Sequence, residues 1–248
     1  MASDQSPSSA GKFGFLESAV MKLLARPAVV SDVQVLTAHF RLITLQGDAL
    51  KGADWVPGQK VQMQFGGFVS RTFTPIAWDA AKGETRLVGF SHGDGPGARW
   101  VVGAKPGDAC VVFGPRRSLD VGSVPRPALF FGDETSFGLA RALGNGPGGL
   151  SNVSFVFEVS SMSESQAVLD ALGIRDAVLI ERNAGDAHLD TIETRATQIV
   201  RDKAPTAFVL SGKAPSIQRL TRSLKQNGVS SNQLRVKPYW APGKTGLD

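Results

Sequence analysis

The chain has 248 residues, of which 42% are hydrophobic and 20% are charged, an ordinary globular composition with enough length for two small domains. The formal net charge is +5, but the lysines and arginines are dispersed, which argues against nucleic-acid binding and favours an anionic small molecule. A single cysteine, Cys110, cannot form a disulfide, a common zinc site or an iron–sulfur cluster, and no two of the three histidines have metal-ligand spacing.

The N-terminal segment, residues 1–25, carries no basic start followed by a long apolar run. Its composition predicts a flexible lead with a short helix. The longest apolar stretches of the chain, such as residues 128–131 and 153–157, are far too short to span a bilayer. We therefore expect a cytoplasmic protein without membrane insertion.

Residues 26–122 alternate between apolar and polar positions with frequent Gly and Pro turn signals. Strand-like runs occur at 29–47, 60–65, 85–92 and 109–114. Several short strands at this spacing predict an antiparallel β-barrel of about six strands. One helix-like stretch interrupts them, beginning near Gly97.

The pattern changes after a linker at 116–127. Residues 123–248 alternate between buried apolar runs and amphipathic stretches, beginning with the run at 128–133 and ending with the run at 233–240. Strands that alternate with helices predict right-handed βαβ units and a parallel sheet. The fold class is thus an antiparallel β-barrel followed by a nucleotide-binding α/β domain.

Residues 71–74 read Arg-Thr-Phe-Thr and precede Pro75, which indicates a strand end. Arg71 can clamp a pyrophosphate through two hydrogen bonds, and Thr74 can offer a hydroxyl group to a ring nitrogen. Phe73 can cover part of a flat cofactor. An exposed arginine, a core phenylalanine and two threonines that favour strands would explain the same residues without any ligand.

Residues 91–108 contain a Gly-rich turn that leads into the predicted helix. The free N–H groups and the dipole of such a helix start bind phosphate oxygens. Asp94 is expected to cap this helix, Trp100 to pack beneath it, and His92 to act as a hydrogen-bonding partner. A capped connecting helix without a ligand is the alternative.

Residues 128–143 form a buried run, a turn at Gly132 and a helix that starts near Thr135. The three-glycine dinucleotide fingerprint is absent here. Only the expected strand–turn–helix geometry of this stretch supports nucleotide binding.

Taken in order, five motifs resemble those of the siderophore-interacting proteins, FAD-containing ferric-siderophore reductases among the ferredoxin-reductase-like flavoproteins. The resemblance extends from about Val29 to Gly243. The motifs are RTFT at 71–74, HGDGPGARW at 92–100, GPRRS at 114–118, GDET at 132–135 and YWAPG at 239–243.

This resemblance implies one FAD site in the barrel half and a substrate site beside it. The implied FAD and nicotinamide contacts are Arg71, Thr72, Phe73, Thr74, His92, Asp94, Gly95, Gly97, Ala98, Trp100, Asp133 and Thr135, with Glu134 beside them. Basic residues above the flavin would attract the negatively charged ferric siderophore, and Lys60, Arg116 and Arg117 match that pattern.

The implied reaction is hydride transfer from NADH or NADPH to FAD, followed by single-electron transfer to siderophore-bound Fe³⁺ and release of Fe²⁺. No catalytic acid, nucleophile or protein-bound metal is required. Residues 157–165 offer no base for a 2′-phosphate, which favours NADH, although Arg182 and Lys213 could supply charge. A reduced ferredoxin is another possible donor.

Two departures and two alternatives accompany the resemblance. Position 73 is Phe where Tyr is common, and Arg182 lacks the Trp that often precedes it. A different flavin reductase with a protein acceptor would use the same motifs. A non-enzymatic siderophore-binding protein would purify without the yellow colour of a flavin.

Overall fold

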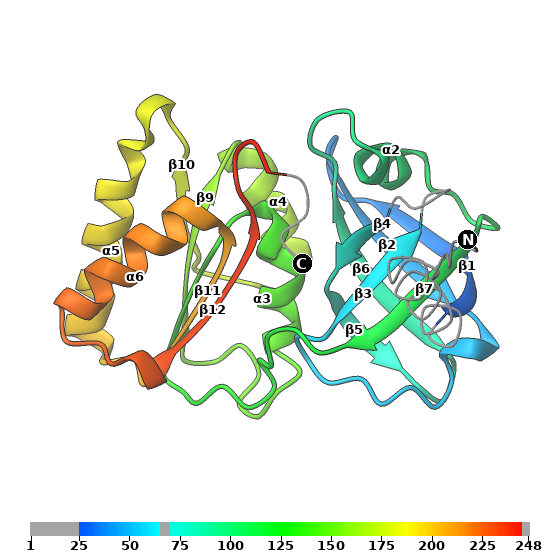
Figure 1. Ribbon diagram of the computed structural model, residues 1–248, viewed down its shortest axis with the longest axis horizontal. Coiled ribbons are helices and arrows are strands. Elements are labelled where there is room, and N and C mark those ends of the chain that lie inside the picture. Colours follow the sequence, from blue (N-terminus) through cyan, green and yellow to red (C-terminus); the bar gives the residue numbers. More distant parts are fainter. Residues whose placement is uncertain (1–24, 65–69, 245–248) are drawn as a thin grey trace, which may run out of the picture.

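The computed structural model describes residues 25–64 and 70–244, which form two β-sheets, one from each half of the chain (Figure 1). The predicted lead, residues 1–25, lies outside this range except for Ala25. No helix within the described ranges has the length and apolar character needed to cross a membrane.

The described residues of the N-terminal half form seven strands, one α-helix and one short 3-10 helix. They are β1 (Ala25–Val35), β2 (Phe40–Gln46), η1 (Asp48–Leu50), β3 (Lys60–Gln64), β4 (Ser70–Phe73), β5 (Pro75–Asp79), β6 (Glu84–Phe90), α2 (Pro96–Gly103) and β7 (Ala109–Arg116). All strand pairs in this sheet are antiparallel.

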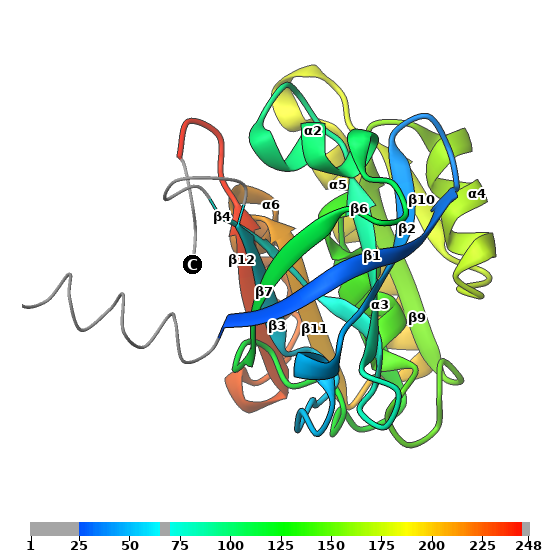
Figure 2. The ribbon, with the colours of Figure 1, turned by 90° about the vertical axis from the view of Figure 1, so that its right-hand side faces the viewer.

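The strand order of this sheet is β4-β3-β7-β1-β2-β6-β5, so β4 and β5 are its two edges. These edges are consecutive in the chain and separated by Thr74 alone. The chain therefore joins the two edges directly at Thr74, and the view onto this half shows how strongly its strands curve (Figure 2). The predicted antiparallel sheet is confirmed, with seven strands where about six were expected, and β4 and β5 count as one if they are taken as a bent strand.

The C-terminal half alternates strands and helices. It consists of β8 (Ala128–Gly132), η2 (Glu134–Ser136), α3 (Phe137–Leu143), β9 (Val153–Val159), α4 (Met162–Ala171), β10 (Val178–Glu181), η3 (Ala184–Asp186), α5 (His188–Lys203), β11 (Ala207–Lys213), α6 (Ala214–Gln226), η4 (Ser231–Gln233) and β12 (Leu234–Trp240). The proposed domain boundary at residues 122 and 123 lies between β7 and β8.

The five strands of this half are all parallel, in the order β10-β9-β8-β11-β12. The chain moves outward from β8 to β10 and then returns to β11 on the other side of β8. The carboxyl ends of β8 and β11 thus form the topological switch point, where open α/β sheets bind ligands. The predicted fold class is confirmed.

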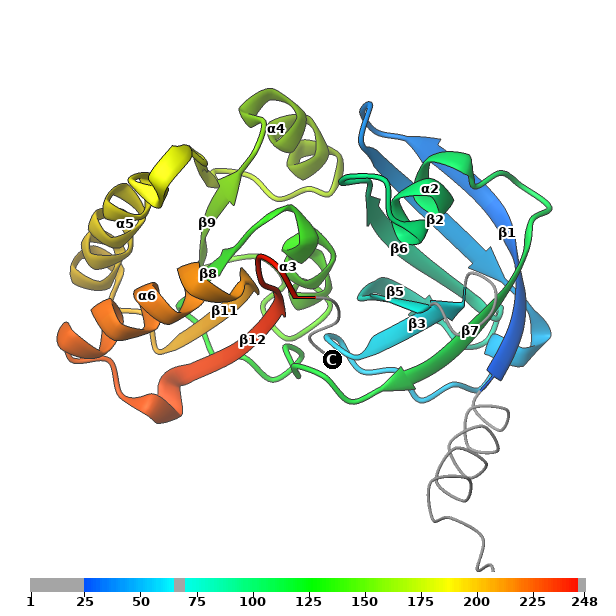
Figure 3. The same ribbon diagram turned by 45° about the horizontal axis from the view of Figure 1, so that its top comes forward.

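Burial explains why these segments form their elements. Every residue of β8 is buried, as a central parallel strand covered on both faces requires. On α6, Ile217, Leu220 and Leu224 are buried at spacings of three and four residues, which gives the helix one apolar face. That face packs with α5 against one side of the sheet, while α3 and α4 lie on the side facing the barrel (Figure 3).

The two halves share one hydrophobic core. Phe40 and Ile76 of the barrel belong to the same buried cluster as the apolar residues of α3 and α4. The rings of Phe40 and Phe137 stack with centroids 5.6 Å apart across this boundary. Asn145 Nδ2 donates to the carbonyl of Ile76 at 2.7 Å. This packing fixes the end of the barrel against the α/β sheet.

Candidate functional site

Arg71 lies beside the start of α2, as a phosphate site between them requires. Arg71 is exposed on β4, and Gly97, in the first turn of α2, is buried. A Cβ atom at residue 97 would lie only 2.9 Å from Arg71 Cγ, so glycine allows this close approach. The guanidinium group and the helix start can therefore act on one anion.

The N-terminus of α2 leaves its first amides available. Its N-cap is Gly95, which has no side chain to accept from them, and Pro96 at the next position has no N–H to satisfy. A Cβ atom at residue 95 would meet open space. These features fit a diphosphate held by backbone N–H groups, the positive end of the helix dipole and Arg71.

The expectation that Asp94 caps α2 is wrong. The side chain of Asp94 is exposed and makes no capping hydrogen bond to the helix. The carbonyl of Asp94 instead accepts from Arg99 Nη1. The physical reason is the position of the N-cap, which falls on Gly95. Asp94 stays a predicted cofactor contact through the loop, as does Ala98, which is buried beside Gly97.

Phe73 and Trp100 pack together, as expected for a ring supported from below. Their ring centroids are 5.6 Å apart and their planes meet at 58°. Both residues are half-buried and lie at the edge of the barrel core. Phe73 therefore has one side held by Trp100 and retains exposed surface for a flat ligand. Thr72 is exposed on the same strand, opposite Gln62.

Thr74 occupies the junction between the two halves. Its hydroxyl group is 3.2 Å from the hydroxyl group of Tyr239 on β12. A Cβ atom at residue 138 would lie 2.9 Å from the carbonyl oxygen of Thr74, so α3 can approach this closely only because residue 138 is glycine. The removal of Tyr239 from solvent raises the pKa of its phenol to about 12, which keeps it protonated at neutral pH.

Asp133 differs from its predicted role as a nicotinamide contact. Its side chain is fully buried at the switch point and is used internally. One oxygen accepts from the Thr135 amide at 2.9 Å and from the Thr135 hydroxyl, and the other accepts from Trp240 Nε1 at 2.7 Å. Burial raises the pKa of Asp133 to about 6. The structure thus shows Asp133 as a support for the site wall.

Glu134 is also used within the protein. It is buried and accepts two hydrogen bonds from Arg182 Nη2, at 2.8 and 2.7 Å. It also accepts from the backbone and the hydroxyl of Ser160. Only Thr135, half-buried, presents a side chain near the surface from this stretch. Glu134 thus forms an internal ion pair that links η2 to the end of β10, and the nicotinamide contact at this residue stays a prediction.

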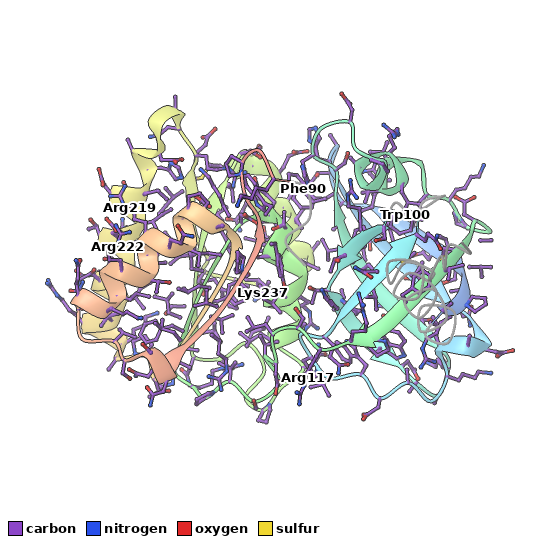
Figure 4. The ribbon with its side chains drawn as sticks, in the orientation of Figure 1. Phe90, Trp100, Arg117, Arg219, Arg222 and Lys237 are labelled. Carbon is purple, nitrogen blue, oxygen red and sulfur yellow. The ribbon has the colours of Figure 1, made fainter. Side chains whose placement is uncertain are left out.

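His92 is exposed, with its ring 5.5 Å from that of Phe90. Phe90 in turn stacks on Phe40 at 4.6 Å, and it lies where the two halves meet (Figure 4). His92 therefore ends an aromatic row that runs from the Gly-rich turn to α3. In the described part of the chain, no three His, Cys, Asp or Glu side chains gather to hold a metal ion.

Lys60 and Arg116 lie directly opposite each other on β3 and β7. Both are half-buried, and Arg116 Nε is buried without a hydrogen-bond partner. Two cations on facing positions are close enough to contact the same anion. Arg117 follows on the exposed side of the connection to β8 (Figure 4). The structure brings the predicted pair together where β3 begins and β7 ends.

A second buried polar group was not predicted from the motifs. Glu158 is fully buried at the end of β9, and its Oε2 lies 2.9 Å from His188 Nε2 and from the Ser216 hydroxyl. Asn183 contacts the other ring nitrogen of His188 at 3.2 Å. This group ties α5 and α6 to the sheet. The partners are far apart in the chain, so spacing could not reveal it.

Comparison with known proteins agrees with this geometry. The family model described as "Siderophore-interacting FAD-binding domain" matches residues 66–119. This segment of the chain is therefore similar to the siderophore-interacting FAD-binding domain. The resemblance predicted from the motifs is thereby confirmed, and the matched segment contains Arg71, Thr74, α2 and Arg116.

A curated relative, the NADPH-dependent ferric-chelate reductase of Escherichia coli (strain K12), is 26% identical over 87% of this chain and 92% of its own length. A siderophore utilization protein from T. fusca has the same fold, with a TM-score of 0.68, 23% identity and coverage of 90% of this chain and 95% of that one. The siderophore-interacting protein SipS from Aeromonas hydrophila also has this fold, with a TM-score of 0.68 and 20% identity. The match covers 89% of this chain and 93% of that one.

We predict that Arg71→Ala weakens FAD binding about 10- to 100-fold, because a charge-assisted bond pair to the diphosphate is lost. The dissociation constant is measured by flavin fluorescence titration of apoprotein. Arg86→Ala is the matched control, since Arg86 is exposed on β6 and pairs only loosely with Glu84 at 3.6 Å. Equal affinity for FAD in wild type and Arg71→Ala would contradict the assignment of Arg71 as a diphosphate contact.

A second prediction concerns pH. The pKa of Asp133 is raised to about 6 in the folded state. Its contribution to stability is therefore fully present below about pH 4 and is lost as the pH rises through about 6. The unfolding free energy of wild type minus that of Asp133→Asn should therefore fall as pH rises from 4 to 7, by up to about 3 kcal/mol.

The matched control for this measurement is Asp79→Asn. The backbone amide of Lys82 donates to Asp79 and lowers its pKa, so Asp79 stabilises the fold at neutral pH and loses that effect in acid. Urea titrations should give a difference for Asp133→Asn that falls from pH 4 to 7, whereas the difference for Asp79→Asn should stay nearly constant in that window and fall only when the pH drops below about 4. A flat difference for Asp133→Asn between pH 4 and 7 would contradict the assignment.

Proposed function

We propose that this protein is an FAD-dependent ferric-siderophore reductase that takes its electrons from a reduced nicotinamide dinucleotide. The observation that carries the proposal is the closeness of Arg71 to the start of α2, three residues from Thr74 at the switch point of the α/β sheet. This arrangement holds a diphosphate at one end and leaves a hydroxyl group at the other. The curated relative's name supports the same activity.

Each residue would contact a different part of FAD. Arg71 and the amides of α2 bind the diphosphate, Phe73 supports the flavin ring against Trp100, and Thr74 orients the edge of the flavin ring. FAD supplies the redox chemistry when bound, since it accepts two electrons from a nicotinamide and can give them singly to iron. The protein contributes binding and orientation.

The substrate contacts we propose are Lys60 and Arg116, with Arg117 in reserve. The substrate in this proposal is a ferric siderophore of net negative charge, because the facing pair at the ends of β3 and β7 offers two half-buried cations. A half-buried cation acts on an anion more strongly than a fully solvated one. Reduction weakens the bonds of iron to hard oxygen ligands, so Fe²⁺ can leave.

The donor in this proposal is NADPH or NADH. The curated relative is named for NADPH dependence, which supports NADPH. The two basic residues considered for a 2′-phosphate are engaged elsewhere, Arg182 with Glu134 and Lys213 with Asp186 at 2.7 Å, which agrees with the NADH preference inferred from the sequence. A ferredoxin donor and a cytoplasmic location stay predictions.

Anaerobic stopped-flow measurement tests this function. The purified protein should show flavin absorbance, bleach with NADPH or NADH, and recover colour when a ferric siderophore is added. Lys60→Ala and Arg116→Ala should bleach at the wild-type rate but recover about 10-fold more slowly, the size expected for loss of one charge-assisted contact.

Lys82→Ala is the control, because Lys82 is an exposed lysine of the β5–β6 turn that pairs with Asp79 at 3.3 Å. Colourless protein would support the non-enzymatic siderophore binder. Bleaching without recovery on any ferric chelate would support a flavin reductase with a protein acceptor. Recovery at the wild-type rate in both cation variants would remove Lys60 and Arg116 from the substrate site.

A further inference from the structure

Tyr239 is aimed at the barrel by an irregularity in β12. On the neighbouring strand β11, Gly212 pairs with Pro238, but the next residue, Lys213, pairs with Trp240. Tyr239 is therefore the extra residue of a bulge in a parallel pair. Bulges redirect a side chain and are common beside active sites. Here the redirected phenol meets Thr74 across the boundary between the two halves.

The bulge is held from both sides. Trp240 Nε1 donates to Asp133 at 2.7 Å, which fixes the residue after Tyr239 to the switch point. Gly212 has φ near +105°, and a Cβ atom there would lie 2.5 Å from an Asp133 carboxylate oxygen. Glycine at residue 212 thus gives Asp133 its place against β11, and Asp133 in turn gives Trp240 a fixed acceptor. These contacts fix the backbone that carries Tyr239.

The polarity of the Tyr239–Thr74 contact follows from the groups available. A phenol is more acidic than an alcohol, so it is the better donor of the pair, and Tyr239 stays protonated in this site. A hydroxyl group has one proton to donate and lone pairs to accept. If Thr74 accepts from Tyr239, its own proton is free for another acceptor. An oxidised flavin presents acceptor nitrogen and oxygen atoms at its ring edge.

We propose that Tyr239 is a positioning residue for the flavin, because its phenol donates to Thr74 Oγ1 and directs the Thr74 proton to an acceptor of the ring. β4 extends about 10 Å from Arg71 to Thr74, so a cofactor held by its diphosphate at Arg71 can reach this hydroxyl group with its ring. The proposal rests on FAD binding as proposed above. In this proposal Tyr239, from the α/β half, sets the direction in which the Thr74 hydroxyl of the barrel half donates.

A double-mutant cycle on the FAD-loaded protein tests the coupling. Tyr239→Phe should keep FAD affinity within about twofold but slow flavin reduction by the nicotinamide about fivefold, as expected for one misdirected hydrogen bond. Thr74→Val should slow it at least as much. In the Thr74→Val background, Tyr239→Phe should have no further effect. Independent, multiplicative losses would overturn the proposal.

A spectroscopic measurement decides the direction of the bond without any turnover. Tyr239 is the only tyrosine of the chain, so its ultraviolet resonance Raman doublet is free of overlap from other phenols. Wild-type holoenzyme should give the intensity ratio of a donating phenol, and Thr74→Val should abolish it. An accepting phenol, or a ratio unchanged by Thr74→Val, would overturn the proposal.

These readouts separate the two hypotheses. Neither uses a ferric chelate, so a loaded flavoprotein that fails to reduce iron would contradict the proposed function and leave the role of Tyr239 to be decided by the cycle and the doublet. A protein that reduces ferric siderophores normally in Tyr239→Phe, with an accepting phenol in wild type, would contradict only the positioning role.

Discussion

The contact of α3 and β12 with the bend at Thr74 is the constraint on which the remaining structure depends. The two edges of the barrel sheet meet at this one residue, and Gly138 and Tyr239 both approach it from the α/β half. A side chain at residue 138 would push α3 away from the barrel. Because this approach is close, the start of α2 with Arg71 and the switch point of the parallel sheet are held in fixed positions on either side of Thr74.

The interface around Thr74 is mainly apolar, and its polar contacts are few and specific. Phe40 stacks between Phe90 and Phe137, which joins β2, β6 and α3 in one aromatic row. Aromatic pairs of this kind add about 0.5–1.5 kcal/mol each beyond the burial of their area. At the outer rim, His39 Nδ1 lies 2.8 Å from Glu164 on α4. The rigid placement of two ligands therefore follows from packing, and the hydrogen bonds set direction.

Local patterns were sufficient to predict the fold class, the barrel followed by the α/β half, and the pairing of Arg71 with a helix start. Strand alternation, turn residues and the Gly-rich run are local signals. The internal use of Asp133 and Glu134 could not be predicted, because their partners Trp240 and Arg182 are distant in the chain. Asp94 was misplaced by one position, since the N-cap falls on Gly95. The bulge at Tyr239 depends on strand register, which no single segment encodes.

The most direct test of the account is a crystal structure of the protein with FAD. We expect the diphosphate on Arg71 and the first amides of α2, and the flavin ring edge within hydrogen-bond distance of Thr74 Oγ1. The Tyr239 contact should be retained. A flavin bound away from the β4–β5 bend, or an empty barrel groove in protein that was never stripped of ligand, would contradict it.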